Sequence, residues 1–141
     1  MAADLEAHYR RTEYCVQAGA RRLVFSIDRH DAGAEVALTA ETGDFRQWAI
    51  VTPCNPASVA LCAEENAARL ENFRRWLETS PYRWLDSRNR DPDGVWPDEP
   101  GALILDIPLA AAEALGRQYG QNAIVHARYG EPPRLLWLTE A

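Results

Sequence analysis

The segment that decides the fold of this chain is Trp48-Ala-Ile-Val-Thr-Pro-Cys-Asn-Pro-Ala-Ser58. Its first part, Trp48 to Thr52, is apolar on both faces of the expected strand, which is typical of a strand in the middle of a sheet. Pro53 and Pro56 end that strand, because proline lacks the backbone N–H that a central strand needs. A polar turn then leads into a helix, and a strand end that faces a helix start is a place where many folds bind a ligand.

A long amphipathic helix follows this segment. From about Ala60 to Glu78, apolar residues recur at spacings of three and four, which places them on one side of a helix. The positions that share this buried side are Ala63, Ala67, Leu70, Phe73 and Leu77.

Shorter patterns predict the remaining elements. Runs rich in β-branched and aromatic residues indicate strands, and proline and glycine mark their ends. The stretch between Gly33 and Gly43 is ambiguous. We expect a short helix over Leu5 to Arg11, strands over Arg22 to Ile27, Tyr82 to Leu85, Ala102 to Ile107, Ala123 to Tyr129 and Arg134 to Leu138, a loop over Asp86 to Pro100, and a helix from Pro108 to about Tyr119.

The order of these elements predicts an α+β fold. From Trp48 to Tyr129 the order is strand, helix, strand, strand, helix, strand, which is that of a ferredoxin-like split βαβ core. Such a core has a mostly antiparallel sheet with two helices on one face, and here extra strands flank it at both ends. With 141 residues and a hydrophobic content of 47%, the chain is expected to form a single globular domain over residues 1–141.

The strand directions of this core bring several polar segments to one edge of the sheet. The first core strand ends at that edge and its helix begins there. The loop before the third strand and the turn before the fourth strand lie at the same edge. The residues expected to meet there are Asn55, Glu65, Asn66, Trp96, Glu99, Gln121 and Asn122.

The composition argues against several classes of function. A formal net charge of −6 and a pI near 5.0 disfavour nucleic acid, whose phosphates repel an acidic surface. No basic start precedes an apolar run, and nowhere do about 18 apolar residues follow one another, so we expect a cytoplasmic protein without a membrane-spanning helix. Three cysteines without metal-ligand spacing indicate no disulfide framework and no metal site, and no cofactor-binding motif is present.

Polar residues at the start of the long helix have two interpretations. Backbone N–H groups at a helix N-terminus attract anions, and Asn66 lies on the buried side of the helix, where it would face such a ligand with Asn55 and Arg69. In the alternative, Asn55 and Asn66 cap backbone groups of the turn, while Glu65 and Arg69 form a solvated pair one helical turn apart.

Two other segments leave a similar choice. Trp96 and Glu99 could supply a stacking face and a carboxylate for acid–base chemistry, or Trp96 could pack the loop onto the core while Glu99 stays in water. Gln121 and Asn122 follow a helix-closing glycine, Gly120, so they could face a ligand or bond to the carbonyls at the helix end.

Spacing disfavours two further kinds of chemistry. Cys54 near a helix N-terminus could be a nucleophile, but none of the three histidines lies in a recognisable motif, so a buried or incidental cysteine is favoured. The acidic residues Asp91, Asp93 and Asp98 lack the alternating ligand spacing of a calcium loop, and a turn is favoured there.

Five motifs, taken together, span nearly the whole chain. They are Tyr9-Arg-Arg-Thr-Glu-Tyr14, Thr52-Pro-Cys-Asn-Pro-Ala-Ser58, Glu65-Asn66 with Arg69, Gly94-Val-Trp96 with Glu99-Pro100, and Tyr119-Gly-Gln-Asn-Ala123. In this order they resemble the bacterial domain-of-unknown-function family 3293, and the resemblance implies no activity. The chain departs from the family pattern at Cys54, where an aromatic residue is expected, and at Pro97-Asp98.

The sequence supports two functional hypotheses. In one, the protein is an interaction module or inhibitor whose acidic, Trp-containing surface docks on another protein. In the other, the polar edge binds a small anionic ligand, and whether a reaction follows stays open, as does the oligomeric state. The residues proposed to bind this ligand are Asn55, Asn66, Arg69, Trp96, Glu99, Gln121 and Asn122.

Overall fold

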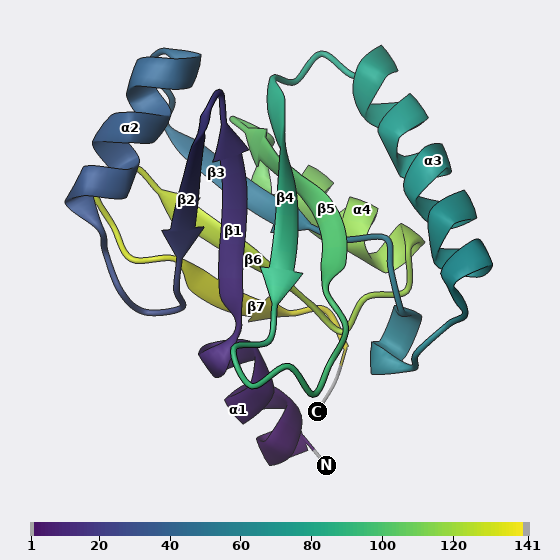
Figure 1. Ribbon diagram of the computed structural model, residues 1–141. Coiled ribbons are helices and arrows are strands. Elements are labelled where there is room, and N and C mark those ends of the chain that lie inside the picture. Colours follow the sequence, from purple (N-terminus) through teal and green to yellow (C-terminus); the bar gives the residue numbers. More distant parts are fainter. Residues whose placement is uncertain (1, 140–141) are drawn as a thin grey trace.

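Seven strands form one curled sheet (Figure 1). The computed structural model describes residues 2–139. The strands are β1 (Glu13–Ala18), β2 (Arg21–Phe25), β3 (Gln47–Val51), β4 (Trp84–Arg90), β5 (Glu99–Leu105), β6 (Ala123–Arg128) and β7 (Arg134–Trp137). Their order in the sheet is β2-β1-β4-β5-β3-β6-β7, and every neighbouring pair is antiparallel.

The helices lie on both faces and at one end of this sheet (Figure 1). They are α1 (Ala2–Arg11), α2 (Ala32–Thr42), α3 (Ala63–Thr79) and α4 (Leu109–Gln118), and a short 3-10 turn, η1 (Pro56–Ser58), lies between β3 and α3. Within residues 2–139, no helix combines the length and apolar character needed to cross a bilayer.

Two hydrophobic clusters form the core, one on each face of the sheet. The first takes side chains from all seven strands and from α2, including Leu38 and Trp48, and therefore lies inside the curl. The second joins the other face of β3, β5 and β6 to α3 and α4 through side chains such as Phe73, Leu77 and Leu115. The expected combination of helices with a mostly antiparallel sheet is confirmed.

The structure contains two elements that the sequence did not predict, β1 and α2. In α2 the buried residues are small or polar, namely Ala34, Glu35 and Ala37 beside Leu38, so the apolar periodicity is weak. The Asp31 carboxylate nevertheless caps this helix by accepting from the Ala34 backbone N–H at 3.0 Å. Tertiary packing against β1 and β2 holds α2 in place.

The loop expected over Asp86 to Pro100 is wrong, because β4 continues to Arg90 and β5 begins at Glu99. The charged side chains that suggested a loop alternate along β4 and stay at the surface. Their backbone pairs with β1, where Cys15 lies opposite Arg88. The actual connection covers only residues 91–98.

Candidate functional site

The residues expected at the polar edge converge at one end of the sheet. There β3 ends, β5 begins, and α1 packs alongside (Figure 1). Side-chain hydrogen bonds join the loop after β3 to the start of β5 and to the turn after α4. Segments far apart in the sequence thus meet where the strand directions predicted.

Asn55 holds the turn after β3 against α3. Its backbone is left-handed, with φ 49° and ψ 64°, and only 3% of its surface is exposed. The Asn55 Oδ1 atom accepts from the Leu61 backbone N–H at 2.9 Å and from Asn66 Nδ2 at 2.7 Å. Asn66 Oδ1 in turn accepts from the Asn55 backbone N–H at 3.0 Å. These bonds agree with the interpretation in which both asparagines fix the turn.

Arg69 joins two loops through their backbone carbonyls. Its Nε donates to the Pro53 carbonyl at 2.6 Å, and its Nη2 donates to the Tyr119 carbonyl. The guanidinium carbon also lies 5.6 Å from the centre of the Tyr119 ring. The expected solvated pair with Glu65 is wrong, because Glu65 accepts from the Cys62 backbone N–H at the start of α3 instead.

Gln121 and Asn122 connect the turn after α4 to the segment after β3. Gln121 Nε2 donates to the Cys54 carbonyl at 2.9 Å and more weakly to the Tyr119 carbonyl near the end of α4 at 3.4 Å. Asn122 Nδ2 donates to Ser58 Oγ at 3.0 Å. Gln121 therefore bonds to a carbonyl at the helix end, as one interpretation expected. It also donates a hydrogen bond to the loop after β3, which is distant in the sequence.

Glu99 places a carboxyl group at the centre of this end. Its Oε2 atom accepts from Asn55 Nδ2 at 2.7 Å and from Trp96 Nε1 at 3.1 Å. Burial raises the pKa of Glu99, and these two hydrogen bonds oppose that rise. No arginine or histidine lies within ion-pair distance of Glu99 in the described part of the chain. Its ionised form is therefore a partly buried charge without a cationic partner among the described residues.

The 91–98 connection is a structured turn that fixes Trp96. The Asp91 carboxylate accepts from the backbone N–H groups of Asp93, Val95 and Trp96 at 2.9 to 3.1 Å. These hydrogen bonds, first of all the one from Trp96, lower the pKa of Asp91. No cluster of three metal-binding side chains occurs among the described residues. The turn interpretation of the acidic residues agrees with this geometry.

A pocket of about 110 Å³ opens beside Glu99, and we call it the edge pocket. Four of the predicted residues line it: Asn55, Trp96, Glu99 and Gln121. The other lining residues are Leu5, His8, Tyr9 and Ser58.

The sequence reasoning missed the contribution of α1 to this pocket. The His8 and Trp96 rings meet edge to face with their centres 6.1 Å apart, and the Tyr9 hydroxyl lies 3.2 Å from Ser58 Oγ. Burial raises the pKa of Tyr9. The one available signal was the Tyr9 to Tyr14 motif, which by itself gives no direction to the site.

A second cavity of about 20 Å³ continues inward from the edge pocket, since Tyr9, Glu99 and Gln121 line both. This volume is enough for about one water molecule. Asn89 lines the inner cavity, and its Oδ1 atom is buried without a hydrogen-bond partner among the described residues. The inner end of the site therefore has a polar atom that can accept a hydrogen bond.

Three predicted binding residues do not line the edge pocket: Asn66, Arg69 and Asn122. They hold the segments that form its wall. The lining contains one carboxylate and no arginine. Just before α3, the backbone N–H groups of Leu61 and Cys62 donate to the side chains of Asn55 and Glu65. The charge of the pocket therefore does not suit the anion expected from the sequence.

Cys54 is buried below the pocket and is 2% exposed. Its thiol lies 3.7 Å from the Pro100 carbonyl, and burial raises its pKa. A thiol that is both inaccessible and harder to ionise is a poor nucleophile. The structure thus agrees with a buried cysteine.

We expect Glu99 to make the folded protein less stable as the pH rises. Because its pKa is raised by folding, its contribution is most favourable below the pKa of the unfolded chain and is lost as the pH rises through the folded pKa. In Glu99→Gln, the amide oxygen still accepts from Asn55 and Trp96 but cannot ionise. Urea unfolding of both proteins from about pH 4 to 8 should show E99Q gaining on the wild type as the pH increases.

The matched control for this measurement is Glu78→Gln, which neutralises an exposed carboxylate near the end of α3. It should follow the wild type at every pH. A constant difference between the wild type and E99Q over the whole range would contradict the assignment of a raised pKa to Glu99.

Comparison with known proteins gives a match to a protein family. No curated protein and no solved structure matches the chain. A sequence model described as "Protein of unknown function (DUF3293)" matches residues 51–124, which is more than half of the 141 residues. The matched range contains all seven predicted binding residues and ends before β7. The chain therefore belongs to the DUF3293 family.

Proposed function

We propose that the edge pocket binds a small molecule through a positively charged nitrogen. The observation that supports this most is the partly buried Glu99 carboxyl, which has no cationic partner among the described residues and lies in a pocket that aromatic rings also line. A cation supplied by a ligand would replace the lost hydration of this carboxylate. The faces of Trp96 and Tyr9 would add cation–π attraction.

The free acceptor atoms of the site support the same class of ligand. Glu99 Oε2 is occupied by Asn55 and Trp96, whereas Glu99 Oε1 accepts no hydrogen bond from the described residues. Gln121 donates through Nε2 to backbone carbonyls, which leaves its Oε1 as a further acceptor. An ammonium group brings up to three N–H donors to such a site.

The size of the pocket limits the ligand. A volume of about 110 Å³ is small against the 300–1,000 Å³ of sites that hold drug-sized molecules. The pocket therefore suits an alkylammonium compound, or the amine end of a longer molecule, more than a nucleotide cofactor. Binding such a cation would lower the pKa of Glu99 and release its proton where it was protonated.

The ligand class can be tested by titrating ¹⁵N-labelled protein with methylammonium and tetramethylammonium chloride at constant ionic strength. We expect saturable shifts of the Trp96 indole N–H and of the Asn55 side-chain amide. In Glu99→Gln, binding should weaken at least about tenfold, since the charged partner is lost. Glu78→Gln, which removes an exposed carboxylate on α3, should bind like the wild type.

Sodium acetate is the competing probe in the same experiment. Saturable shifts with acetate and none with either ammonium salt would support the anion expected from the sequence and overturn our proposal. An unchanged spectrum with all probes would overturn ligand binding of this size class at the edge pocket.

Protein docking, the second hypothesis from the sequence, gains no specific support. The large apolar side chains that are exposed in the described chain lie on separate segments rather than on one element. They are Val24, Val36, Val59, Val95 and Tyr129.

We further propose that β3, α3, β4, β5, α4 and β6 form the ferredoxin-like split βαβ unit. In support, these strands are successive neighbours in the order β6-β3-β5-β4 and each pair is antiparallel. Both helices pack in the same hydrophobic cluster. The hairpin of β1 and β2 and the strand β7 would then be additions at the two margins.

A further inference from the structure

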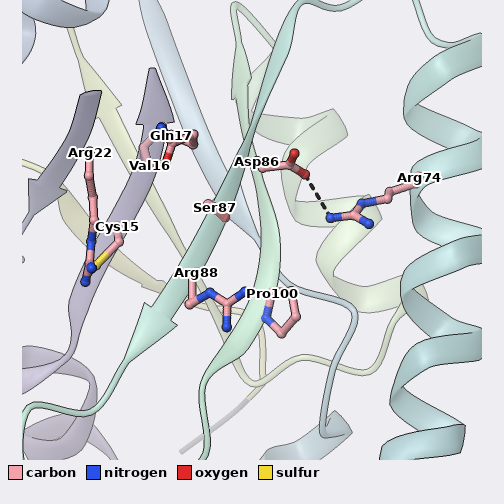
Figure 2. Close-up of a pocket in the computed structure, with 9 residues that line it drawn as sticks. All are labelled: Cys15, Val16, Gln17, Arg22, Arg74, Asp86, Ser87, Arg88 and Pro100. Atoms are coloured by element: carbon pink, nitrogen blue, oxygen red, sulfur yellow. Dashed lines mark hydrogen bonds and ion pairs between the residues drawn. The ribbon is translucent and has the colours of Figure 1, made fainter. Parts of the chain in front are cut away.

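We propose that the protein has a second binding site, which takes a phosphate group, in a groove beside α3 (Figure 2). The groove has a volume of about 340 Å³ and is larger than the edge pocket. Three arginines from three different elements line it: Arg22 from β2, Arg88 from β4 and Arg74 from α3. We call it the arginine groove.

The sheet register explains why Arg22 and Arg88 line the same groove. Cys15 on β1 lies opposite Arg88 on β4, and Gln17 on the same strand lies opposite Arg22 on β2. The two arginines therefore approach one short stretch of β1 from both sides. Cys15 is 4% exposed, because the Arg22 guanidinium lies beside its thiol (Figure 2).

The charge of the arginine groove contrasts with the rest of the protein. Three arginines and a single carboxylate, that of Asp86, line it, whereas the whole chain has a formal net charge of −6. A concave surface lined mainly by one sign of charge attracts the opposite ion more strongly than a flat surface does. This charge would draw an anion to the groove.

Two of the three guanidinium groups are held only by exposed ion pairs. Arg74 Nη2 lies 3.0 Å from Asp86 Oδ1 (Figure 2), and Arg88 Nη1 lies 3.6 Å from Asp98 Oδ2. These four side chains are 40% to 57% exposed. Pairs of this kind contribute about 0–1 kcal/mol, so a ligand can recruit both arginines at small cost.

Arg22 is the guanidinium that is most available. Its Nη2 donates to Cys15 Sγ at 3.2 Å, and no carboxylate of the described residues lies within 4 Å of it. A thiol is a weak acceptor, and a phosphate oxygen would be a stronger one. The planar fork of a guanidinium can bind two oxygens of a phosphate group at once.

This site is independent of the edge pocket. Glu99 lines the edge pocket and the next residue, Pro100, lines the arginine groove, so the two sites lie on opposite faces of β5. Neither the ligand class nor the residues are shared. The phosphate site can therefore exist whether or not an ammonium compound binds at Glu99.

The probe for this site is inorganic phosphate, with pyrophosphate and acetate as further arms, at constant ionic strength. The signals to follow are the Nε–H groups of Arg22, Arg74 and Arg88 and the backbone N–H of Cys15. We expect saturable shifts with phosphate and tighter binding of pyrophosphate. Arg22→Gln and Arg88→Gln should each weaken binding by about tenfold, which is the usual size of one charge-assisted hydrogen bond.

The matched controls are Arg21→Gln on β2 and Arg75→Gln on α3, which remove neighbouring exposed arginines that do not line the groove. Both should bind phosphate like the wild type. Shifts that grow linearly without saturation, or an equal loss in R21Q and R22Q, would show only general attraction to arginines and overturn the proposal. Equal binding of acetate and phosphate would overturn the assignment to phosphate.

Discussion

Replacement of Asn55 by alanine is expected to lower the free energy of unfolding by about 3–5 kcal/mol. The side chain accepts from the Leu61 backbone N–H and from Asn66 Nδ2, and it donates to Glu99. Alanine would leave the Leu61 N–H without its acceptor, Asn66 Nδ2 with only a weak 3.5 Å bond to the Leu61 carbonyl, and Glu99 with the Trp96 bond alone. The position is 3% exposed, an unsatisfied buried group costs about 1–3 kcal/mol, and the left-handed backbone adds strain for alanine. Tryptophan fluorescence during urea unfolding at pH 7 would measure the loss.

Two other substitutions at the same position separate the causes. Asn55→Gly removes the hydrogen bonds but tolerates the left-handed backbone, so it should be less destabilising than alanine by the cost of that strain. Asn55→Asp keeps the shape but turns the donor toward Glu99 into a second acceptor, so its defect should shrink as the pH falls. A loss below about 1 kcal/mol in N55A would contradict the central role of Asn55.

Replacement of Gly101 by alanine is expected to cost about 3 kcal/mol or more. A Cβ atom there would lie 2.3 Å from the Val51 carbonyl oxygen and 3.0 Å from the Thr52 Cα atom. Both are backbone atoms at the end of β3, which pairs with β5. The steric clash can therefore be relieved only if β3 and β5 move apart. Because the Thr52 hydroxyl donates to the Pro100 carbonyl at 2.7 Å, the movement would also reach the wall of the edge pocket.

Gly33→Ala is the control for this substitution, because the same chemical change occurs where an added Cβ meets only Asp31 Oδ1 at 3.4 Å. Gly33 lies in α2, where alanine is the better helix former, so this variant should be unchanged or slightly more stable. Thermal unfolding of both variants compares them directly. A similar melting temperature for G101A and the wild type would show that the strands can move apart freely.

The sequence predicted the elements whose own residues define them. The apolar run at Trp48 gave β3, and the periodicity through Phe73 and Leu77 gave α3, apart from a start at Ala63 instead of Ala60. The sequence did not predict β1, α2 or the second half of β4. These elements are stabilised mainly by their contacts with one another, which the local pattern of residues does not reveal. Strand direction alone was enough to bring Asn55 and Glu99 together.

The chemistry of the site depended on contacts that local pattern does not contain. The anion expectation relied on free backbone N–H groups at the start of the long helix, with Arg69 beside them. The N–H groups of Leu61 and Cys62 instead donate to Asn55 and Glu65, and the Arg69 donors go to the carbonyls of Pro53 and Tyr119. His8 and Tyr9 contribute because α1 packs against segments that are distant in the sequence, at Trp96 and Ser58. The residues that neighbour Arg69 and α1 in the sequence give no indication of these long-range contacts.

The two margins of the sheet approach each other at one point. The Asp28 backbone N–H, just after β2, donates to the Pro133 carbonyl, just before β7, at 2.7 Å, and Gly130 N–H donates to Glu35 Oε2 at 2.8 Å. The hairpin of β1 and β2 joins the rest of the sheet through the pairing of β1 with β4. During synthesis on the ribosome, this pairing cannot form until β4 has been made. At about 5–20 residues per second, translation from Tyr14 to its partner Asn89 takes roughly 4–15 s. Throughout that interval the edge of β1 that later pairs with β4 has no partner strand, and α2, which is made directly after the hairpin, can already cover its apolar side.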